Sequence, residues 1–340
     1  MTDVPIIDCH IHLYPEAEIP TLAWAKPGDP LAVEHGIPEY DAVTAPIPSL
    51  KGFVLVETDR KSDLTEDGWK LPLMEVAWFA RVATGKPNPG EVFSEGTAER
   101  CLGIIPWAPV PAGPAALEKY IEKAREVAGE EAWRKVKGFR YLLQDKPHGT
   151  MLTEEFIEGV QYLGRKGYIF SLGVDSHRRG KKQLEETVEM IGRAHDDVPD
   201  EEKVTFIINH MCKADLAIYN LTDPGYVSWR TTVYTLSSCE KTYMQISGGL
   251  QDMPESLKNQ SANDIFAAIL PYLGILLATF GPDRLIFGSD WPVCTLGIES
   301  NACVKWLEIV KRMCHMASLE EDKVRRLFAG TAIEAFGLDV

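Results

Sequence analysis

The stretch Arg284-Leu-Ile-Phe-Gly-Ser-Asp-Trp-Pro-Val293 decides the fold of this chain. Leu285 to Phe287 form a short apolar run, and Gly288 lets the backbone pass close to another group before Asp290. A carboxylate directly after a buried strand is costly unless a metal, a cation or a reacting proton meets it. Asp290 could also cap a turn before Pro292, and on this stretch alone the two interpretations are equally supported. The rest of the chain has to decide between them.

Eight short apolar runs containing β-branched residues are spread along the sequence. Their near-continuous apolar character is typical of parallel strands that are covered on both faces. Helical patterns lie between most of them, which favours an α/β fold of the (β/α)8 TIM-barrel type, formed by residues 1–340 as a single domain. A doubly wound open sheet is the alternative, but no glycine-rich phosphate loop follows any run. The runs are Val4–Cys9, Lys51–Glu57, Leu102–Trp107, Val136–Tyr141, Tyr168–Val174, Val204–Asn209, Thr242–Ser247 and Leu285–Gly288.

Local signals predict where several helices begin. Thr153 is followed by two glutamates and predicts an N-cap, and Ser318 with Glu321 predicts a capping box. The most apolar stretch, residues 265–280, has Asn263 as a candidate N-cap. It is shorter than the roughly 20 residues of a membrane span, so we expect a buried helix there.

Composition excludes several classes of partner. The chain has 35 Lys and Arg against 50 Asp and Glu, a formal net charge of −15, which argues against binding to nucleic acid or to an anionic membrane. The seven cysteines include no CxxC pair, and reduced thiols fit them best. The N-terminus lacks the basic and apolar regions of a signal peptide. We therefore expect a cytoplasmic protein that binds a small molecule, and a homo-oligomer is compatible with the sequence.

A barrel predicts where catalytic side chains lie, because they occupy the carboxyl ends of the strands. The first run leads into His10 and His12, and residues two apart on a strand share a face, so both should point to the barrel mouth. Two imidazoles on one face can hold a divalent metal, or a water and a substrate oxygen. The fourth, sixth and eighth runs add three more polar side chains, namely Arg140, His210 and Asp290.

These motifs resemble the amidohydrolase superfamily, in particular its amidohydrolase-related branch of TIM-barrel metal-dependent hydrolases, which includes sugar-lactone and pyrone-dicarboxylate lactonases. The resemblance runs in order over nearly the whole chain, and the early HxH with the late GSDWP is its specific part. It implies a distorted, amidohydrolase-like barrel. The matching pieces are Ile7–Leu13, Gly138–Arg140, Asn209-His210, Ile246–Gly249, Gly288–Val293 and Leu327–Gly337.

Several positions depart from the pattern of this family. Asn209 stands where Asp is usual, and Thr331 stands where the closing helix usually carries Asn. Dinuclear members have a bridging Lys at the fourth strand, and the nearby residue here is Arg140, which argues against a two-metal site. Metal-dependent relatives also place a ligand His at the fifth strand. His177 lies beyond the end of that strand in a basic loop, so we expect it near the mouth and not on a metal.

The resemblance implies a hydrolase that opens a small lactone, either a sugar-acid lactone such as an aldonolactone or a carboxylated lactone. Asp290 would take a proton from water and then protonate the departing oxygen. His10, His12 and His210 would polarise the carbonyl and stabilise the oxyanion. One Zn²⁺ on His10, His12 and Asp290 is chemically reasonable. Because the fifth-strand His is missing and Arg140 lies nearby, we expect this metal to be weakly held or absent.

Other residues are predicted to contact the substrate. Arg140 would hold a carboxylate or hydroxyl, with a salt bridge inside the barrel as its alternative role. Tyr141, His177 and Trp291 could border the pocket, although core packing explains the two aromatic residues equally well. The loop 14–49 is expected to fold over the mouth.

Two other functions stay open. A metal-dependent, non-oxidative decarboxylase of the same superfamily would place His177 at bonding distance of a metal. A catalytically silent barrel that acts as a binding protein would have Asp290 paired away from any cavity, or a mouth blocked by the connection 59–100. We expect the middle of that connection, Gly85–Gly90, to be a surface excursion after a short helix.

Overall fold

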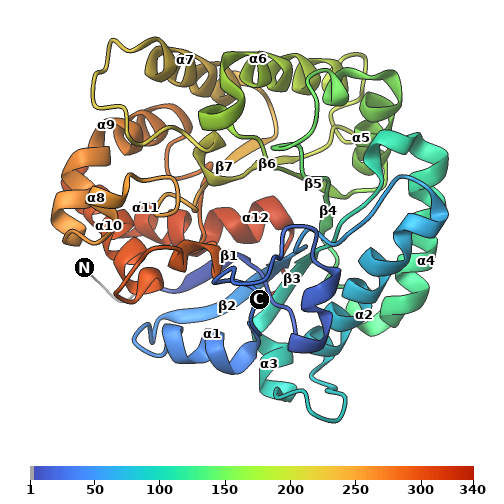
Figure 1. Cartoon of the computed structure of the whole chain (residues 1–340). Coiled ribbons are helices and arrows are strands. Elements are labelled where there is room, and N and C mark those ends of the chain that lie inside the picture. Colours follow the sequence, from blue (N-terminus) through green and yellow to red (C-terminus); the bar gives the residue numbers. More distant parts are fainter. Residues whose placement is uncertain (1–3) are drawn as a thin grey trace.

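The computed structural model describes residues 4–340, so the first three residues of the N-terminus inspected for a signal peptide lie outside the described part. Within it, eight strands alternate with helices along the chain (Figure 1). Each predicted run overlaps one strand, so the prediction of eight strands is confirmed, although β1, β2 and β3 extend beyond the predicted bounds. They are β1 (Ile6–Ile11), β2 (Leu50–Val56), β3 (Cys101–Ile105), β4 (Gly138–Arg140), β5 (Ile169–Leu172), β6 (Phe206–Ile208), β7 (Thr242–Ile246) and β8 (Leu285–Phe287).

All strand pairs are parallel, and they form two groups in chain order, β1-β2-β3 and β4-β5-β6-β7-β8. Isolated backbone bridges join the two groups at both edges. Trp107 bridges to Arg140 at one seam, and Ile11 bridges to Trp291 at the other. Together with the helices outside, this is the architecture of a (β/α)8 barrel, distorted where the strand ladder thins at the two seams.

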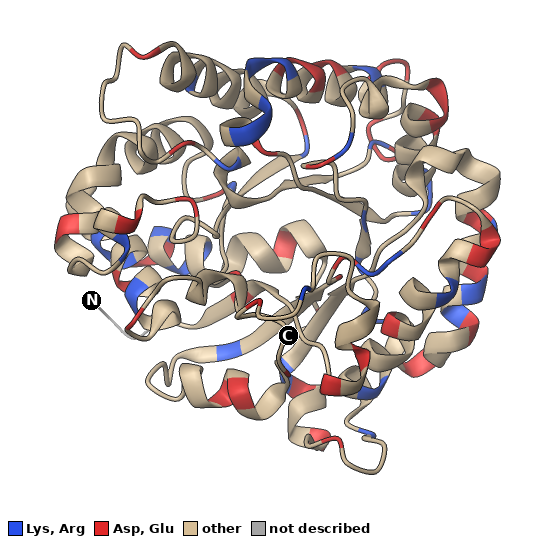
Figure 2. Ribbon diagram, in the orientation of Figure 1, with Lys and Arg blue, Asp and Glu red and all other residues tan. Residues whose placement is uncertain are grey.

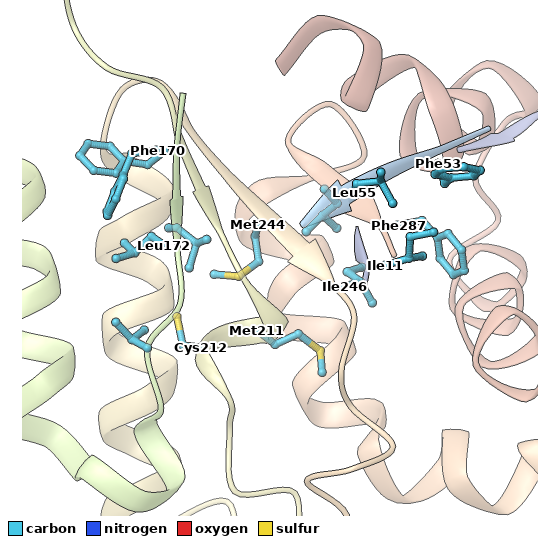
Figure 3. Close-up of a cluster of buried hydrophobic side chains, with 14 of the residues drawn as sticks. Ile11, Phe53, Leu55, Phe170, Leu172, Met211, Cys212, Met244, Ile246 and Phe287 are labelled. Carbon is cyan, nitrogen blue, oxygen red and sulfur yellow. The ribbon is translucent and has the colours of Figure 1, made fainter. Parts of the chain in front are cut away.

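Helices surround the strands, and apolar side chains on the outward strand faces pack beneath them (Figure 3). Most charged residues lie on these helices and on loops, and few lie on the strands (Figure 2). The long helices are α2 (Lys70–Thr84), α4 (Gly113–Trp133), α5 (Glu154–Arg165), α6 (Ser176–His195), α7 (Pro224–Ser238), α9 (Ala262–Phe280) and α10 (Ala302–Met316). Shorter ones are α1 (Ile37–Thr44), α3 (Glu95–Arg100), α8 (Glu255–Lys258), α11 (Glu321–Arg325) and α12 (Thr331–Phe336).

A second apolar cluster fills the inside of the barrel. Val54, Ile207 and Ile286 alternate with outward-facing residues on their strands and belong to this cluster. Ala332 and Phe336 of α12 pack against it and close the end of the barrel at which the strands begin. One end of the barrel is therefore plugged by an apolar helix, and the cavity described below lies at the opposite end.

Helix starts depend on which side chain reaches the free amides. The side chain of Thr153 accepts an amide of α5, which confirms this N-cap. α9 begins after Ser261, whose hydroxyl accepts an amide in the first turn, so the Asn263 cap is wrong. The Ser318 capping box is also wrong, because Ser318 has a left-handed φ of 51° and α11 begins at Glu321 itself.

The connection 59–100 is mostly part of the barrel. α2 occupies fifteen of its residues and packs on α4, so the helix is longer than expected. The surface excursion lies at residues 85–90 as predicted, and residues 86–90 are exposed. α9 is nineteen residues long, which is longer than the apolar stretch suggested. By length and composition α9 could cross a membrane, a weak signal because core helices pass the same test.

Candidate functional site

A cavity of about 440 Å³ opens at the carboxyl ends of the strands. Tyr14, Trp24 and Leu31 contribute to its wall, so the loop 14–49 folds over the mouth as expected. Much of its polar lining comes from strand ends, as a barrel requires, and the rest comes from the loops that follow. The charged and imidazole side chains that line it are His12, Asp29, Glu57, Asp59, Arg140, Asp145, Arg178, His210, Lys213 and Asp290.

Three histidines meet one aspartate at the inner end of this cavity. The Oδ1 atom of Asp290 lies 3.5 Å from Nε2 of His12, and 3.8 Å from Nε2 of both His10 and His210. All four side chains are buried, and His10 is fully buried. The ends of β1, β6 and β8 thus bring together the four residues that the sequence placed at one mouth.

A bulge in β1 aims the two histidines of the HxH motif. Asp8 pairs with Phe53 and Ile11 pairs with Leu55, so β1 has one residue more than β2 between these pairs. The extra residue turns Ile11 outward to the helices, which leaves His10 and His12 on the cavity side. The prediction of a shared face is therefore confirmed, although the bulge itself left no signal in the sequence.

The hydrogen bonds of the histidines fix their tautomers. Nδ1 of His12 lies 3.1 Å from the carbonyl oxygen of Val56, and Nδ1 of His10 lies 2.9 Å from Oε1 of Gln245. The amide nitrogen of Gln245 donates to the carbonyl of Cys9, which fixes its orientation. Both partners can only accept, so Nδ1 carries the proton in the neutral form of each ring, and Nε2 is the nitrogen that faces the carboxylate.

This arrangement fits a divalent cation. The Nε2 atom of His10 is buried and has no hydrogen-bond partner in residues 4–340. One ligand atom each from His10, His210 and Asp290 lies within 4.8 Å of the other two. Two neutral imidazoles and a carboxylate are a donor set that Zn²⁺ accepts. The sequence suggested His10, His12 and Asp290 as the metal ligands. In the structure His210 takes the place of His12 in this set, and His12 lies beside it.

Burial keeps two of these imidazoles neutral. Burial is the largest cause of the lowered pKa of His10, followed by the charges of His12 and Arg140, and the pKa lies well below its ordinary value. Burial and the charges of His10 and Lys213 likewise hold the pKa of His210 well below its ordinary value. Neutral imidazole is the form that ligates a metal, so the lone pairs remain available at neutral pH.

Asp8 locks the seam between β1 and the segment after β8. Its carboxylate accepts the amide of Ser289 at 2.7 Å and the hydroxyl of Tyr40 at 3.0 Å. Burial raises the pKa of Asp8 to about 6, and these hydrogen bonds oppose the shift. Because Asp290 directly follows Ser289, this seam sets the distance between Asp290 and His10.

The segment after β7 needs its glycines. Gly248 has a φ of 66°, and a Cβ there would lie 2.7 Å from Nδ1 of His210 and 3.1 Å from Oδ2 of Asp290. A Cβ on Gly249 would lie 2.5 Å from the Trp306 ring. Ser247 places its hydroxyl 2.9 Å from Nδ1 of His210. The Ser-Gly-Gly piece therefore lets the chain pass the site while it orients one imidazole.

A left-handed turn follows β6. Residues His210 to Lys213 have φ values of 52°, 56°, 57° and 45°, although none is glycine. Left-handed backbone costs about 1–2 kcal/mol per residue, so this turn is strained. Three hydrogen bonds from other helices hold the turn. Trp229 donates to the carbonyl oxygen of Met211 at 2.8 Å. The hydroxyl of Ser176 and the amide of His177 both donate to the carbonyl oxygen of Lys213 at 3.0 Å.

Arg140 faces the cavity but is already paired. Its Nη1 lies 3.1 Å from Oε1 of Glu57, and both side chains are buried. Burial raises the pKa of Glu57, and Arg140 opposes that shift. The alternative role of Arg140, a salt bridge inside the barrel, is thus observed. Sequence reasoning missed Glu57 even though it ends the second run, where the strand-end rule could have found it.

Three predicted substrate contacts lie outside the wall of this cavity. Trp291 is 2% exposed and packs against His35 and Tyr40, and Tyr141 packs between Trp107 and Phe156, so both serve the core. His177 is directed to a neighbouring hollow, where its Nε2 lies 3.6 Å from Asp215. The fifth strand thus brings no imidazole to the His–Asp cluster. Lys213, Gln245 and Gln251 were missed, and no sequence motif marks them.

The chain is similar in sequence and in structure to known lactonases and amidohydrolases. Over 349 aligned residues the chain is 32% identical to an L-rhamnono-gamma-lactonase of Scheffersomyces stipitis, covering 99% of this chain and 100% of that protein. An L-fucono-1,5-lactonase of Burkholderia multivorans is 28% identical and matches 70% of this chain and 72% of its own length. A zinc-bound amidohydrolase structure from B. multivorans superposes with a TM-score of 0.71 at 23% identity, covering 98% and 100% of the two chains. The amidohydrolase family model matches residues 7–338, and the chain therefore belongs to the amidohydrolase family.

Proposed function

We propose that this protein is a hydrolase that opens a small sugar lactone. The observation that carries the proposal is the Asp290 carboxylate, which lies between three imidazoles at the inner end of a cavity large enough for a monosaccharide lactone. The full-length relative that is named a lactonase supports the same reaction. We further propose that residues 1–340 form one catalytic domain and that it works in the cytoplasm, in line with its seven free cysteines.

In the proposed reaction, Asp290 accepts a proton from water as the water oxygen bonds to the lactone carbonyl carbon. The bond between that carbon and the ring oxygen then breaks, and Asp290 returns the proton to the departing oxygen. The product is a hydroxy acid, which ionises at neutral pH. Gln251 donates to Oδ2 of Asp290 at 3.2 Å and leaves Oδ1 for the reaction. His10, His12 and His210 contribute by polarising the carbonyl oxygen.

A divalent metal in this site would be held by His10, His210 and Asp290, with His12 beside them. When bound, such a cation polarises the substrate carbonyl and lowers the pKa of water. The expectation of a weakly held metal relied on the missing fifth-strand His and on the positive charge of Arg140, and only the second reason is removed by the structure. Glu57 neutralises that charge at 3.1 Å, so we propose firmer binding of one metal than the sequence suggested.

The charge of the cavity favours an uncharged, hydroxylated lactone over a carboxylated one. Five acidic residues line the cavity against three basic ones, and carboxylates accept hydrogen bonds from sugar hydroxyls. Asp59 is one of them, and burial together with the nearby Glu57 raises its pKa to about 6. A substrate carboxylate would meet this acidic wall and the already paired Arg140. We therefore propose aldonolactones as the substrate class.

The two alternatives lack their required features. The decarboxylase would need His177 at the metal, and His177 pairs with Asp215 outside the cluster. The silent barrel would need Asp290 away from any cavity, and Asp290 lines the cavity of about 440 Å³.

A panel of γ- and δ-aldonolactones, assayed by acid release with a pH indicator, tests the proposal. We expect hydrolysis of at least one hydroxylated lactone, no comparable rate with carboxylated lactones, and a loss of activity after chelation that added Zn²⁺ restores. Metal analysis of the purified protein should give close to one divalent ion per chain. If no lactone is opened, or if benzoate-type acids are decarboxylated instead, the proposal is wrong.

A further inference from the structure

Lys213 is a nearly buried cation without a partner. It is 9% exposed and lines the cavity beside His210, and its ammonium has no hydrogen bond or ion pair within the described residues. Two other lysines of the described residues, the buried Lys258 and the half-buried Lys135, have partners for their ammonium groups. The ammonium of Lys258 lies 2.7 Å from Glu255, and that of Lys135 donates to two backbone carbonyls. Lysine is almost never buried unless it is paired, so the position of Lys213 needs another explanation.

The other basic residues of the cavity wall are neutralised. Arg140 pairs with Glu57 at 3.1 Å, and Arg178 pairs with Asp175 at 2.6 Å. Lys213 is therefore the one cation of the described cavity wall that has no carboxylate within 4 Å, although its charge also acts on Asp252, where it opposes the rise in pKa that burial causes. Its field still reaches the catalytic cluster, since it contributes to the lowered pKa values of both His10 and His210.

The Lys213 side chain projects from a strained segment of backbone. Lys213 ends the left-handed turn that begins at His210, and contacts from Ser176, His177 and Trp229 hold the turn in place. Strain that distant elements maintain is concentrated at functional sites. The same turn thus carries an imidazole of the cluster at one end and the unpaired ammonium at the other.

We propose that Lys213 is a catalytic residue that binds the negative charge formed when the lactone is opened. This inference rests on the proposed function. An aldonolactone is uncharged, and its carbonyl oxygen becomes an oxyanion only when the water oxygen bonds to the carbonyl carbon. The product then carries a carboxylate. A cation that is unpaired in the free enzyme interacts most strongly after that charge has formed, so it favours the transition state over the substrate.

Replacement of Lys213 by Met tests this role, because Met keeps most of the apolar stem and removes the charge. We expect kcat on the best lactone to fall about 100-fold while KM changes little, which is the signature of an interaction made only in the transition state. The corresponding aldonate should bind the variant at least about tenfold more weakly in calorimetry, since the carboxylate loses its partner. Lys213→Arg should recover part of kcat.

Thermal stability provides the second measurement. Removal of an unpaired buried charge should leave the Tm of Lys213→Met unchanged or higher. Lys135→Met is the matched control: its ammonium is satisfied by the carbonyls of Ala83 and Ala98 away from the cavity, so its Tm should fall while kcat stays constant.

Three results would overturn the inference. An unchanged kcat with a raised KM would make Lys213 a ligand of substrate hydroxyls, a lower Tm together with lower activity would make it structural, and undiminished aldonate binding would remove the anion role. If the wild-type enzyme opens no lactone, the proposed function fails by itself. Aldonate binding and Tm of the two variants then still decide whether Lys213 is an anion-binding residue.

Discussion

The two ends of the barrel are formed by the same eight strands and have opposite chemistry. At the carboxyl end, His10, His210 and Asp290 are buried together around a cavity. At the amino end, α12 inserts Ala332 and Phe336 into an apolar cluster. The mouth buries polar groups at a cost in stability, whereas the plug buries apolar surface, which stabilises the fold.

This difference separates function from stability within one architecture. Substitutions at the mouth should lower activity with little effect on folding, and substitutions at the plug should do the reverse. The following predictions test that separation, beginning with the largest effect.

Replacement of Asp290 by Asn should abolish most of the lactonase activity. The amide keeps the shape of the side chain but cannot accept the proton of water, and this residue acts in both steps of the proposed reaction. We expect kcat to fall by about 10⁴-fold with little loss of Tm. Steady-state kinetics and thermal unfolding of the purified variant measure both quantities.

Asp283 provides the matched control, because it lies before β8 at the opposite end of the same strand and pairs with Lys323 on the surface. Asp283→Asn should leave kcat unchanged. Metal analysis of Asp290→Asn separates a lost base from a lost ligand. If Asp290→Asn retains more than about a tenth of the wild-type kcat, Asp290 is not the base.

At the other end, Phe336→Ala should destabilise the protein by about 3–4 kcal/mol, since it leaves a cavity in the plug. Phe336 is 4% exposed. Urea unfolding measures this loss, and kcat per folded molecule should stay close to the wild-type value. Val340→Ala, at a residue that is 75% exposed, is the control and should change neither quantity. A large fall in kcat for Phe336→Ala in the folded protein would mean that the two ends are coupled.

Sequence reasoning succeeded where side-chain direction follows from strand position. The apolar runs are visible in the chain, so the strand-end rule alone places His10, His210 and Asp290 at one mouth, with His12 beside them. It failed where direction depends on contacts from distant elements. The turn that presents Lys213 contains no glycine, and the residues that hold it lie on other helices, so its left-handed backbone left no local signal.

Residues just beyond strand ends were left open by the sequence, with core packing as likely as a place in the pocket wall. Trp291 and Tyr141 directly follow cavity residues, yet both turn into the core, because the chain bends after Asp290 and Arg140. Glu57 was a different kind of omission. It ends the second run, so the strand-end rule that identified the histidines also applies to it. A single glutamate at a strand end does not by itself indicate a function, and the importance of Glu57 follows only from its ion pair with Arg140.

The seam that carries the catalytic groups should show a specific pH dependence. Asp8 has a pKa of about 6 in the folded protein against 3.8 ordinarily, because it is buried. Between these values the folded state binds a proton that the unfolded state has released, so the contribution of this group to stability is lost as pH rises. Relative to Asp8→Asn, which cannot titrate, the wild type should lose on the order of 3 kcal/mol between about pH 4 and pH 7.

Urea unfolding of both proteins at a series of pH values gives this difference, and groups common to both cancel. A difference that stays constant would show that Asp8 keeps its ordinary pKa in the folded protein, and a wild-type advantage that grows with pH would show a lowered pKa. Tyr40→Phe is a useful companion, because the hydroxyl of Tyr40 donates to Asp8 and helps to stabilise the carboxylate. Its loss should raise the pKa of Asp8 and move the stability change to higher pH.

The smallest effect distinguishes two parts of the mouth itself. Glu57→Gln removes the charge that neutralises Arg140 while it keeps the size of the side chain. An uncompensated guanidinium beside the cluster should weaken metal binding and lower kcat/KM for a neutral aldonolactone by about tenfold, an effect of about 1.4 kcal/mol. The same charge should favour an anionic substrate, so the ratio of rates for carboxylated over neutral lactones should rise. Competition between the two lactones measures this ratio directly. An unchanged ratio of the two rates would mean that the Arg140–Glu57 pair only stabilises the barrel. The acidic residues around Asp59 would then select the uncharged substrate, and the Arg140–Glu57 pair would play no part in selectivity.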